Sequence, residues 1–476
     1  MAWVRNDRND PDQRALAHYI MGILYDSEGD LEAAIKEYEE ASSSEEEDIS
    51  RIHIRLAVDY LLLEHKDKAI EELMIAEGLD PKSTKTRFLL ALIYASDGKY
   101  DAAQKKYEEI VQINPDDLRA LAGLADLYVV QEKIDEAALI YKKLLEKDDA
   151  SPILHFNLGI IDFRNGKIED AIQELTTATR LQEDYIEAYI ALAMLYETKK
   201  DLAGAIAQYE KVVSLSPANS KTYYQLGRLY YETGRHDKAL RQYELLVALS
   251  PKEVDAYIEW ANVYLKEKKP LEAIRVLEHA LEAGVDDADL YLALGFSAAT
   301  AHQDDEALAY YQKALDLRPD DPKIRFYIGS FYDQRKQKEL AIRELREAIR
   351  LDASFAEAYN YLGYIFAEDS VNLDEAVLLI KKALESDPEN GAYIDSLGWA
   401  YFRKGMLDEA LRCLEKAVSL EPDDPVIRDH IGDVYRKKGM IDQAAESWKK
   451  SLEIDPQQEQ VREKLKECSN DDALKH

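Results

Sequence analysis

The sequence predicts an all-α protein made of thirteen helix–turn–helix repeats. Three observations lead to this expectation: a motif that recurs about every 34 residues, a scarcity of turn-forming residues, and helical stretches that stop at glycine or proline. Glycine (19) and proline (13) are few among 476 residues. A β-sandwich or barrel needs a turn roughly every 8–12 residues, so the composition excludes it and favours helices throughout.

The repeat motif consists of a small residue, in most copies an aromatic residue three positions later, and an alanine twelve positions after the small residue. The small residue occupies thirteen positions: Gly22, Ala57, Ala91, Ala125, Gly159, Ala193, Gly227, Ala261, Gly295, Gly329, Gly363, Gly398 and Gly432. The alanine is present in every copy: Ala34, Ala69, Ala103, Ala137, Ala171, Ala205, Ala239, Ala273, Ala307, Ala341, Ala376, Ala410 and Ala444. Such regularity predicts one repeated unit rather than several unrelated domains.

Each copy contains two helical stretches separated by a short break. Leu226 and Tyr230 in the first stretch, and Ala239, Tyr243 and Leu246 in the second, show the spacing. The break often holds a glycine that can end a helix in the left-handed conformation: Gly29, Gly98, Gly166, Gly234, Gly405 and Gly439. The second helix usually stops at a proline: Pro81, Pro115, Pro217, Pro251, Pro319, Pro388, Pro422 and Pro456. We expect the small residues to let the paired helices approach closely and the aromatic residues to fill the core.

The combined pattern, L-G/A-x-x-Y, then A-x-x-x-Y/L and then P, resembles the tetratricopeptide repeat, as residues 226–251 (LGRLYYETGRHDKALRQYELLVALSP) illustrate. The resemblance implies a right-handed α-solenoid, a superhelix of antiparallel helix pairs whose first helices line a concave groove. Residues 1–14 are a lead segment, and residues 459–476 are a capping helix with a frayed tail that begins at Cys468. The predicted repeats are 15–49, 50–83, 84–117, 118–151, 152–185, 186–219, 220–253, 254–287, 288–321, 322–355, 356–390, 391–424 and 425–458.

Charge and motif content exclude several functions. The formal net charge of −33 disfavours binding to nucleic acid or to anionic membranes, and no apolar run is long enough for membrane insertion. No catalytic, metal-binding or phosphate-binding motif is present, so we expect no enzyme activity and no cofactor. Cys413 is expected in a helix core and Cys468 in the tail, where its thiol could react. The expected partners are other proteins, and the sequence does not indicate an oligomeric state.

Protein binding is expected at the groove-facing positions of the first helices, which the resemblance assigns to the second, fifth, ninth, twelfth and thirteenth residues of a repeat. From the fifth repeat onward many of these residues are apolar or aromatic, and the candidate groove residues are Phe156, Ile160, Phe163, Ile190, Met194, Tyr224, Arg228, Tyr231, Ile258, Asn262, Leu265, Leu292, Phe296, Phe326, Tyr364, Trp399 and Phe402. The alternative is that many of them pack between neighbouring repeats. Trp399 is the expected anchor for an apolar partner segment, with Phe402, Tyr364 and Phe326 around it.

A groove that grips a carboxylate is a second possibility, because some tetratricopeptide co-chaperones hold a C-terminal carboxylate with Lys, Arg and Asn. Arg228 and Asn262 form the one consecutive polar pair of this kind, and a two-carboxylate clamp needs several cations.

Two repeats depart from the pattern at the aromatic position, which holds Asp162 in one and Ala298 in the other. Either the neighbouring Phe163 fills the space of the aromatic residue missing at Asp162, or the array is locally less stable at this position.

Residues 359–418, with an extra residue within 367–373, resemble the C-terminal region of bacterial outer-membrane tetratricopeptide lipoproteins. Some of these proteins are adaptors between a carboxyl-terminal processing protease and cell-wall hydrolases. The start MAWVRNDRNDPDQR has no secretory signal, so the chain is cytoplasmic as written, or periplasmic and outer-membrane-associated if its true N-terminus is missing. Another reading is a regulatory array separated from a catalytic domain, such as a glycosyltransferase.

Overall fold

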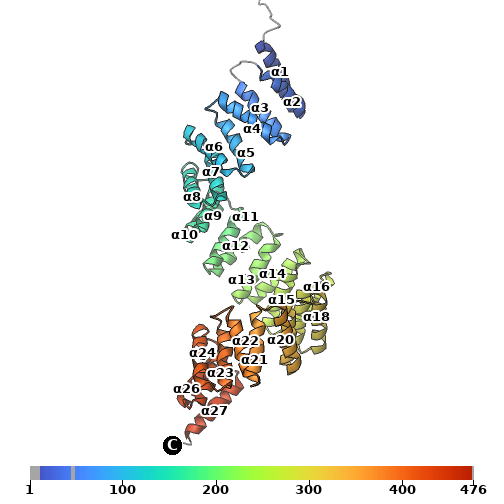
Figure 1. The fold of residues 1–476 in the computed structure, drawn as a ribbon, viewed down its shortest axis with the longest axis vertical. Helices are drawn as coiled ribbons and strands as arrows, with labels where there is room; N and C mark the ends of the chain where they lie inside the picture. The colour runs from blue at the N-terminus through green and yellow to red at the C-terminus, as the bar shows by residue number, and fades with distance from the viewer. Residues whose placement is uncertain (1–10, 44–48, 474–476) are drawn as a thin grey trace, which may run out of the picture. The chain divides into compact units, whose positions relative to one another are not determined.

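The computed structural model describes residues 11–43 and 49–473. Over these residues the chain forms 27 α-helices and no β-strand (Figure 1). The expected all-α fold built from helix pairs is confirmed. Of the predicted lead segment, residues 1–10 lie outside the described part, and the first helix already begins at Pro11.

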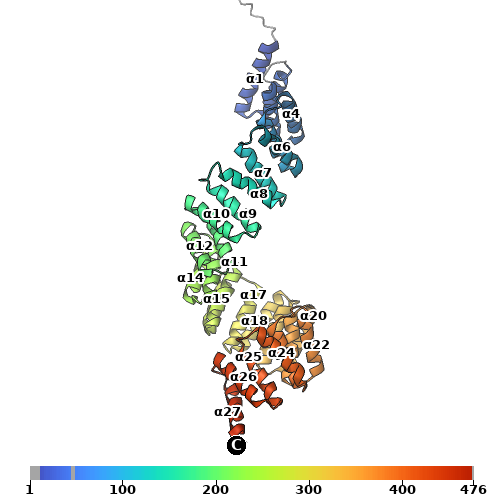
Figure 2. The same cartoon turned by 90° about the vertical axis from the view of Figure 1, so that its left-hand side faces the viewer.

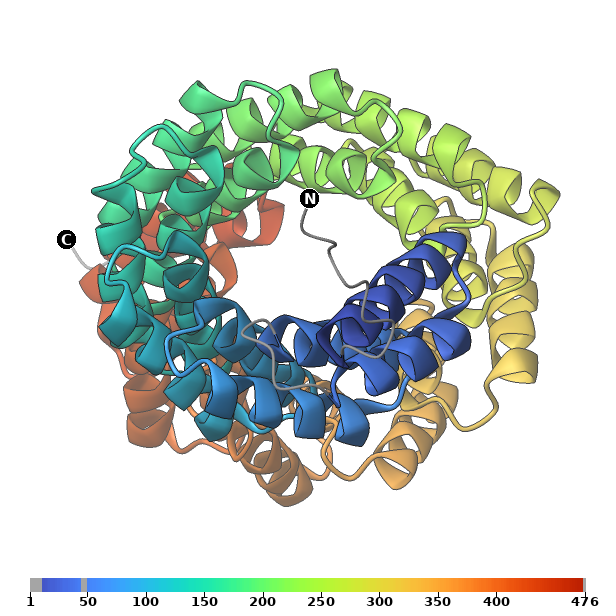
Figure 3. The same ribbon diagram turned by 90° about the horizontal axis from the view of Figure 1, so that it is seen from above.

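The chain divides into two compact units, and unit 1 comprises Met1–Leu229. Its helices are α1 (Pro11–Glu28), α2 (Leu31–Ala41), α3 (Ile49–Leu62), α4 (Lys66–Leu79), α5 (Thr84–Ser96), α6 (Tyr100–Ile113), α7 (Leu118–Val130), α8 (Ile134–Leu145), α9 (Pro152–Arg164), α10 (Ile168–Leu181), α11 (Ile186–Thr198), α12 (Leu202–Leu215) and most of α13 (Ser220–Glu232). The pairs of this unit follow one another in chain order (Figure 2). They run along a curve with the helices in an inner and an outer row (Figure 3).

Unit 2 comprises Tyr230–His476 and begins within α13. Its helices are α14 (His236–Leu249), α15 (Val254–Lys266), α16 (Pro270–Glu282), α17 (Ala288–Thr300), α18 (Asp304–Leu317), α19 (Pro322–Gln334), α20 (Lys338–Leu351), α21 (Ala356–Glu368), α22 (Leu373–Leu384), α23 (Gly391–Arg403), α24 (Leu407–Leu420), α25 (Pro425–Lys437), α26 (Ile441–Ile454) and α27 (Glu459–Ala473). Both units are therefore built from the same kind of helix pair.

The small residue of the motif lies where the two helices of a pair come closest. A Cβ atom added to Gly22 would lie 2.5 Å from the ring of Tyr38, and one added to Gly432 would lie 2.4 Å from the indole of Trp448. Both distances are far below van der Waals contact, so these positions exclude even alanine unless the aromatic side chain moves. The expected role of the small residues in close helix approach is confirmed here.

Successive pairs are joined by apolar contacts between a second helix and the next first helix. Helices α10 and α11 show the arrangement, with a buried cluster made of Ala171, Leu175, Ala178, Ala188, Leu192 and Leu195. The last three are the third, seventh and tenth residues of repeat 186–219. The same positions in α7 and α25 are buried against α6 and α24. Every first helix that follows another pair therefore has one face available for the preceding second helix.

The turn inside each pair contains a residue with positive φ. Six turns use the predicted glycines, with φ between 70° and 80°. The equivalent residues of the other seven turns are Glu64, Glu132, Lys200, Lys268, His302, Lys336 and Ser370. The glycine prediction is confirmed, but the turn geometry does not depend on glycine. In the longer turn between α21 and α22, Asn372 also has positive φ (46°).

The C-terminal helix α27 packs against α26 through Val461, Leu465 and Cys468. Cys468 is only 3% exposed, and its Sγ lies 3.8 Å from the carbonyl oxygen of Ile441. The expectation of a frayed tail with a reactive thiol is wrong for Cys468, because the thiol fills the core between the last two helices. Residues 474–476 of the predicted tail lie outside the described residues.

At the aromatic position of the fifth repeat, the carboxylate of Asp162 is itself buried, and the ring of Phe163 does not take its place. It is 2% exposed, and burial raises its pKa. Phe163 is 37% exposed, so the expectation that its ring replaces the missing aromatic residue is wrong. Ala298 is fully buried in its own repeat.

Candidate protein-binding surface

The candidate groove residues of unit 1 lie on the first helices α9, α11 and α13. Phe156 and Ile160 line a hollow of about 240 Å³ together with Tyr141, Asn157 and Arg164. The Tyr141 hydroxyl donates to Asp126 Oδ1 at 2.6 Å, and Asn157 Nδ2 donates to the Tyr141 hydroxyl at 3.3 Å. The hollow therefore has an apolar wall and an ordered polar edge.

Other predicted residues of unit 1 differ in exposure. Met194 is 53% exposed and, like Phe163, presents an apolar side chain to solvent, whereas Ile190 and Tyr224 are half-buried. Arg228 is bound to Glu197 and Gln225. Its guanidinium is therefore engaged within unit 1, which weakens the carboxylate-clamp reading.

In unit 2 the aromatic residues of α17, α19 and α21 form a connected row. The ring of Phe296 lies 5.9 Å from that of Tyr327, and Phe326 lies 5.7 Å from both Tyr327 and Tyr361. Phe296 is 41% exposed, so the row ends in a ring that solvent can reach. We call Phe296, Phe326, Tyr327 and Tyr361 the aromatic row.

The remaining predicted residues of unit 2 are placed as follows. Asn262 is exposed, Leu292 is buried, and the half-buried residues are Tyr231, Ile258, Leu265, Phe326, Tyr364 and Phe402. Burial raises the pKa of Tyr364 to about 12, so its hydroxyl stays protonated in neutral solution. Leu292, expected in the groove, instead belongs to the core of its repeat.

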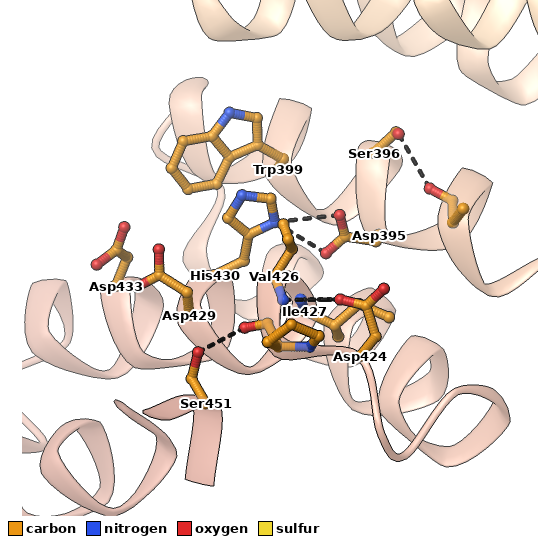
Figure 4. Close-up of polar contacts among 12 residues, drawn as sticks. Asp395, Ser396, Trp399, Asp424, Val426, Ile427, Asp429, His430, Asp433 and Ser451 are labelled. Carbon is orange, nitrogen blue, oxygen red and sulfur yellow. Dashed lines mark hydrogen bonds and ion pairs between the residues drawn. The ribbon is translucent and has the colours of Figure 1, made fainter. Parts of the chain in front are cut away.

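Trp399 is a core residue, and the expectation that its side chain projects into the groove is wrong. It is 7% exposed, and its ring stacks with that of Phe402 at 5.0 Å and with the imidazole of His430 at 4.2 Å. Figure 4 shows Trp399 beside His430. Its indole nitrogen donates to Glu368 Oε2 at 2.8 Å. The two stacking contacts and the hydrogen bond at the polar edge leave little of the indole for a partner.

His430 stands beneath Trp399 as half of a buried ion pair. Its Nδ1 lies 2.9 Å and 3.1 Å from the two carboxylate oxygens of Asp395 (Figure 4). Asp395 belongs to α23 and His430 to α25, so the pair connects two consecutive repeats. Burial opposes protonation of the imidazole, but Asp395, Asp429 and Asp433 outweigh it and raise the pKa of His430.

Two further carboxylates on α25 are held by one lysine. Lys464 Nζ lies 2.8 Å from Asp429 Oδ1 and 2.7 Å from Asp433 Oδ2. Burial raises the pKa of Asp433 despite the nearby ammonium group. Because the capping helix supplies Lys464, this contact also fixes α27 to the last helix pair.

The sequence contained a signal for part of this polar cluster. Asp395 and Asp429 occupy the fifth position of their repeats and Asp433 the ninth, which are the positions used to choose the groove residues. His430 at the sixth position and Lys464 in the cap fall outside that pattern. Their pairing depends on contacts between residues about 35 positions apart.

The described residues also bear on metal binding and membrane insertion. No group of three His, Cys, Asp or Glu residues there is arranged to hold a metal ion. In the same part of the chain no helix combines the length and apolar character that crossing a membrane requires.

Comparison with known proteins identifies the repeat. The sequence pattern described as "Tetratricopeptide repeat" matches segments 15–48, 94–158, 156–220, 197–248, 224–274, 258–322, 330–391, 392–424 and 427–458. The chain belongs to the tetratricopeptide repeat family. All the matched segments belong to this one family.

Individual relatives are distant. "Tetratricopeptide repeat protein 8" of Caenorhabditis elegans is 25% identical over 47% of this chain and 43% of its own length. "BBSome complex member BBS4" of Bos taurus is 20% identical over 45% of this chain and 41% of its own. The tetratricopeptide chain thus matches less than half the length of either relative.

Solved structures with tetratricopeptide repeats are also similar. The crystal structure of yeast Tom70 shares 17% identity, with a TM-score of 0.43 over 98% of this chain and 97% of that chain. The APC/C heterotetramer Cut9–Hcn1 shares 17% identity, with a TM-score of 0.44 over 96% of each chain.

Proposed function

We propose that the protein is a non-enzymatic scaffold that binds apolar peptide or helix segments of other proteins on the face formed by its first helices. The observation that carries the proposal is the exposure of large apolar side chains on this face of an acidic protein. Phe163 and Met194 in unit 1 and Phe296 in unit 2 are all more than one-third exposed. Exposed apolar side chains that adjoin a hollow or an aromatic row are typical of recognition surfaces.

Phe296 replaces Trp399 as the expected anchor of unit 2. Its ring is accessible but already oriented by Tyr327, so a partner would lose little conformational entropy in contacting it. A few aromatic anchors of this kind usually supply most of the binding free energy. In unit 1 the hollow beside Phe156 and Ile160 can receive one apolar side chain of the partner.

The proposal predicts that the first-helix face, and not other exposed apolar side chains, determines affinity. Peptides would be selected on the whole chain from a displayed random library, and their dissociation constants measured by isothermal titration calorimetry. Phe296→Ala or Met194→Ala should weaken binding by about tenfold or more, according to the unit that a peptide uses. Leu378→Ala is the matched control, because Leu378 is 69% exposed but lies on the second helix α22. Peptides that bind both first-helix variants like the wild type would exclude this face.

A more specific role is that of an adaptor for a carboxyl-terminal processing protease and its cell-wall hydrolase substrates. The supporting feature is the lengthened turn between α21 and α22, where Ser370 and Asn372 have positive φ. Shortening this turn by deletion of Val371 should abolish recruitment of such a protease in a pull-down, while circular dichroism confirms folding. Recruitment that is absent with the intact chain would reject the adaptor role and leave the scaffold proposal standing. The alternative, a regulatory array that belongs to an enzyme, predicts a longer gene product in which a catalytic domain accompanies these repeats.

A further inference from the structure

The first helix of unit 1 carries an apolar face that no described part of the chain covers. Leu16, Ile20, Met21 and Leu24 of α1 are 52%, 50%, 40% and 49% exposed. Together with exposed Ala17 they share one side of the helix, since residues three, four, seven and eight apart line one face. This is an unusual density of exposed aliphatic side chains for a chain with a net charge of −33.

The apolar face of α1 corresponds to the face that other first helices bury against the preceding repeat. Ala17, Met21 and Leu24 are the third, seventh and tenth residues of their repeat. In α7, α11 and α25 these positions are buried against the preceding second helix. The face of α1 is therefore shaped to pack against another helix.

The opposite end of the array does not offer a complementary surface. Among the side chains of α27 that the structure describes, residues 459–468, the exposed ones are Glu459, Gln460, Arg462, Glu463, Lys466 and Glu467, all of them polar. A second copy could not bury the α1 face against this cap without leaving charged groups desolvated. A head-to-tail contact is therefore a poorer way to cover α1 than a contact between two apolar faces.

We propose that α1 is a self-association surface, on which the α1 helices of two copies pack antiparallel across a two-fold axis. In the register centred between Ile20 and Met21, small Ala17 lies opposite Leu24 of the second copy, and Ile20 lies opposite its Met21. Large side chains thus face small or flexible ones, as close helix packing requires. A two-fold interface uses the same patch on both copies, so one apolar face is sufficient.

Charge at the ends of the face favours the same antiparallel arrangement. Arg14 is exposed near the start of α1 and Glu28 at its end. Antiparallel packing places Arg14 of one copy near Glu28 of the other at both ends of the interface. A parallel arrangement would instead bring like charges together at each end.

The test is sedimentation velocity of the full chain over a concentration series at low and high salt. The wild type should dimerise, and high salt should strengthen the dimer because it screens the repulsion between two acidic chains. Ile20→Glu should raise the dimer dissociation constant by at least about tenfold, because it places a charge in the centre of the apolar contact. Leu139→Glu is the matched control, since Leu139 is 70% exposed on α8 and should leave the dimer unchanged.

A charge swap tests the orientation. Arg14→Glu and Glu28→Arg should each weaken the dimer, and the double variant should restore it, with circular dichroism confirming that all variants fold. A chain that is monomeric at every concentration, or a dimer that survives Ile20→Glu, would overturn the proposal and leave the face to another protein. Failure of the double variant to recover would overturn the antiparallel register.

Discussion

Asp59 in unit 1 and Asp395 in unit 2 are both buried carboxylates, with exposures of 1% and 7%, but their surroundings differ. Asp395 lies against the imidazole of His430. Neither carboxylate oxygen of Asp59 has a hydrogen-bond partner among the described residues, and the nearby Arg55 binds Asp26 at 3.0 Å instead. A buried aspartate thus connects two repeats in unit 2, whereas in unit 1 it lowers the stability of the fold.

The difference appears in the protonation of the two sites. Burial, with the charge of Asp26 added, raises the pKa of Asp59 to about 6. In the Asp395–His430 pair the proton is held by His430, because the pKa of its imidazole is raised. Mild acid should therefore stabilise both units, but in unit 1 by neutralising a carboxyl and in unit 2 by completing an ion pair.

The largest expected effect comes from breaking the pair in unit 2. Asp395→Asn should lower the free energy of unfolding of this unit by about 3 kcal/mol at pH 6, because it leaves a buried imidazolium without its counter-charge. The imidazolium contributes fully below the ordinary histidine pKa of 6.5 and is lost as the pH rises through the raised value. The difference from the wild type should therefore shrink in alkaline solution.

Urea unfolding followed by tryptophan fluorescence measures this change. Unit 2 holds Trp260, Trp399 and Trp448, three of the four tryptophans, so the signal reports mainly on that unit. A variant as stable as the wild type at pH 6 would show that the pair does not stabilise the fold.

A smaller effect of opposite sign is expected in unit 1. Asp59→Asn should raise the free energy of unfolding of this unit by roughly 2 kcal/mol at pH 7, because the buried charge is removed. With a folded pKa of about 6 and an ordinary value of 3.8, wild-type stability falls as the pH rises between the two. The advantage of the variant should accordingly disappear below that window. Hydrogen exchange of the α3 amides measures the difference in stability between the variant and the wild type. A variant less stable than the wild type at pH 7 would show that the Asp59 charge does not destabilise unit 1.

The smallest effect tests whether the two units respond separately. Glu64 and Lys268 have φ of 62° and 59° in equivalent turns of unit 1 and unit 2. Replacing either with glycine should stabilise its own unit by about 0.5–1 kcal/mol, because glycine adopts this conformation without the clash of a Cβ atom. Hydrogen exchange resolved by helix should show protection increasing in one unit only. Equal changes in both units would mean that they unfold together.

The repeated elements could be predicted from the sequence because the same pattern occurs in all thirteen repeats. Gly22 and Gly432 at close approaches, and Gly29 in a turn, follow from local sterics that a single chain reveals. The burial of Trp399 was missed, because it depends on Glu368 and His430 in neighbouring repeats. Positions in a repeat indicate which face a side chain occupies but not what the next repeat places over it.

The candidate surface was predictable to a similar degree. Phe163, Met194 and Phe296 were recognised from their positions and are exposed. Leu292 was chosen by the same rule and is buried, so position alone does not distinguish a groove residue from a core residue. The lone carboxylate of Asp59 gave no signal, because an acidic residue in a helix of an acidic protein is ordinary.

The pairing of Asp395 with His430 also limits how this gene can change length. Repeats separated by 34 residues can be lost or duplicated through unequal recombination without disturbing the register of helix packing, as for segment 186–219. Loss of segment 391–424 would instead join α25 to a pair that lacks Asp395 and leave His430 without its counter-charge. A shortened array should therefore keep segments 391–424 and 425–458 together, because the buried pair needs one residue from each.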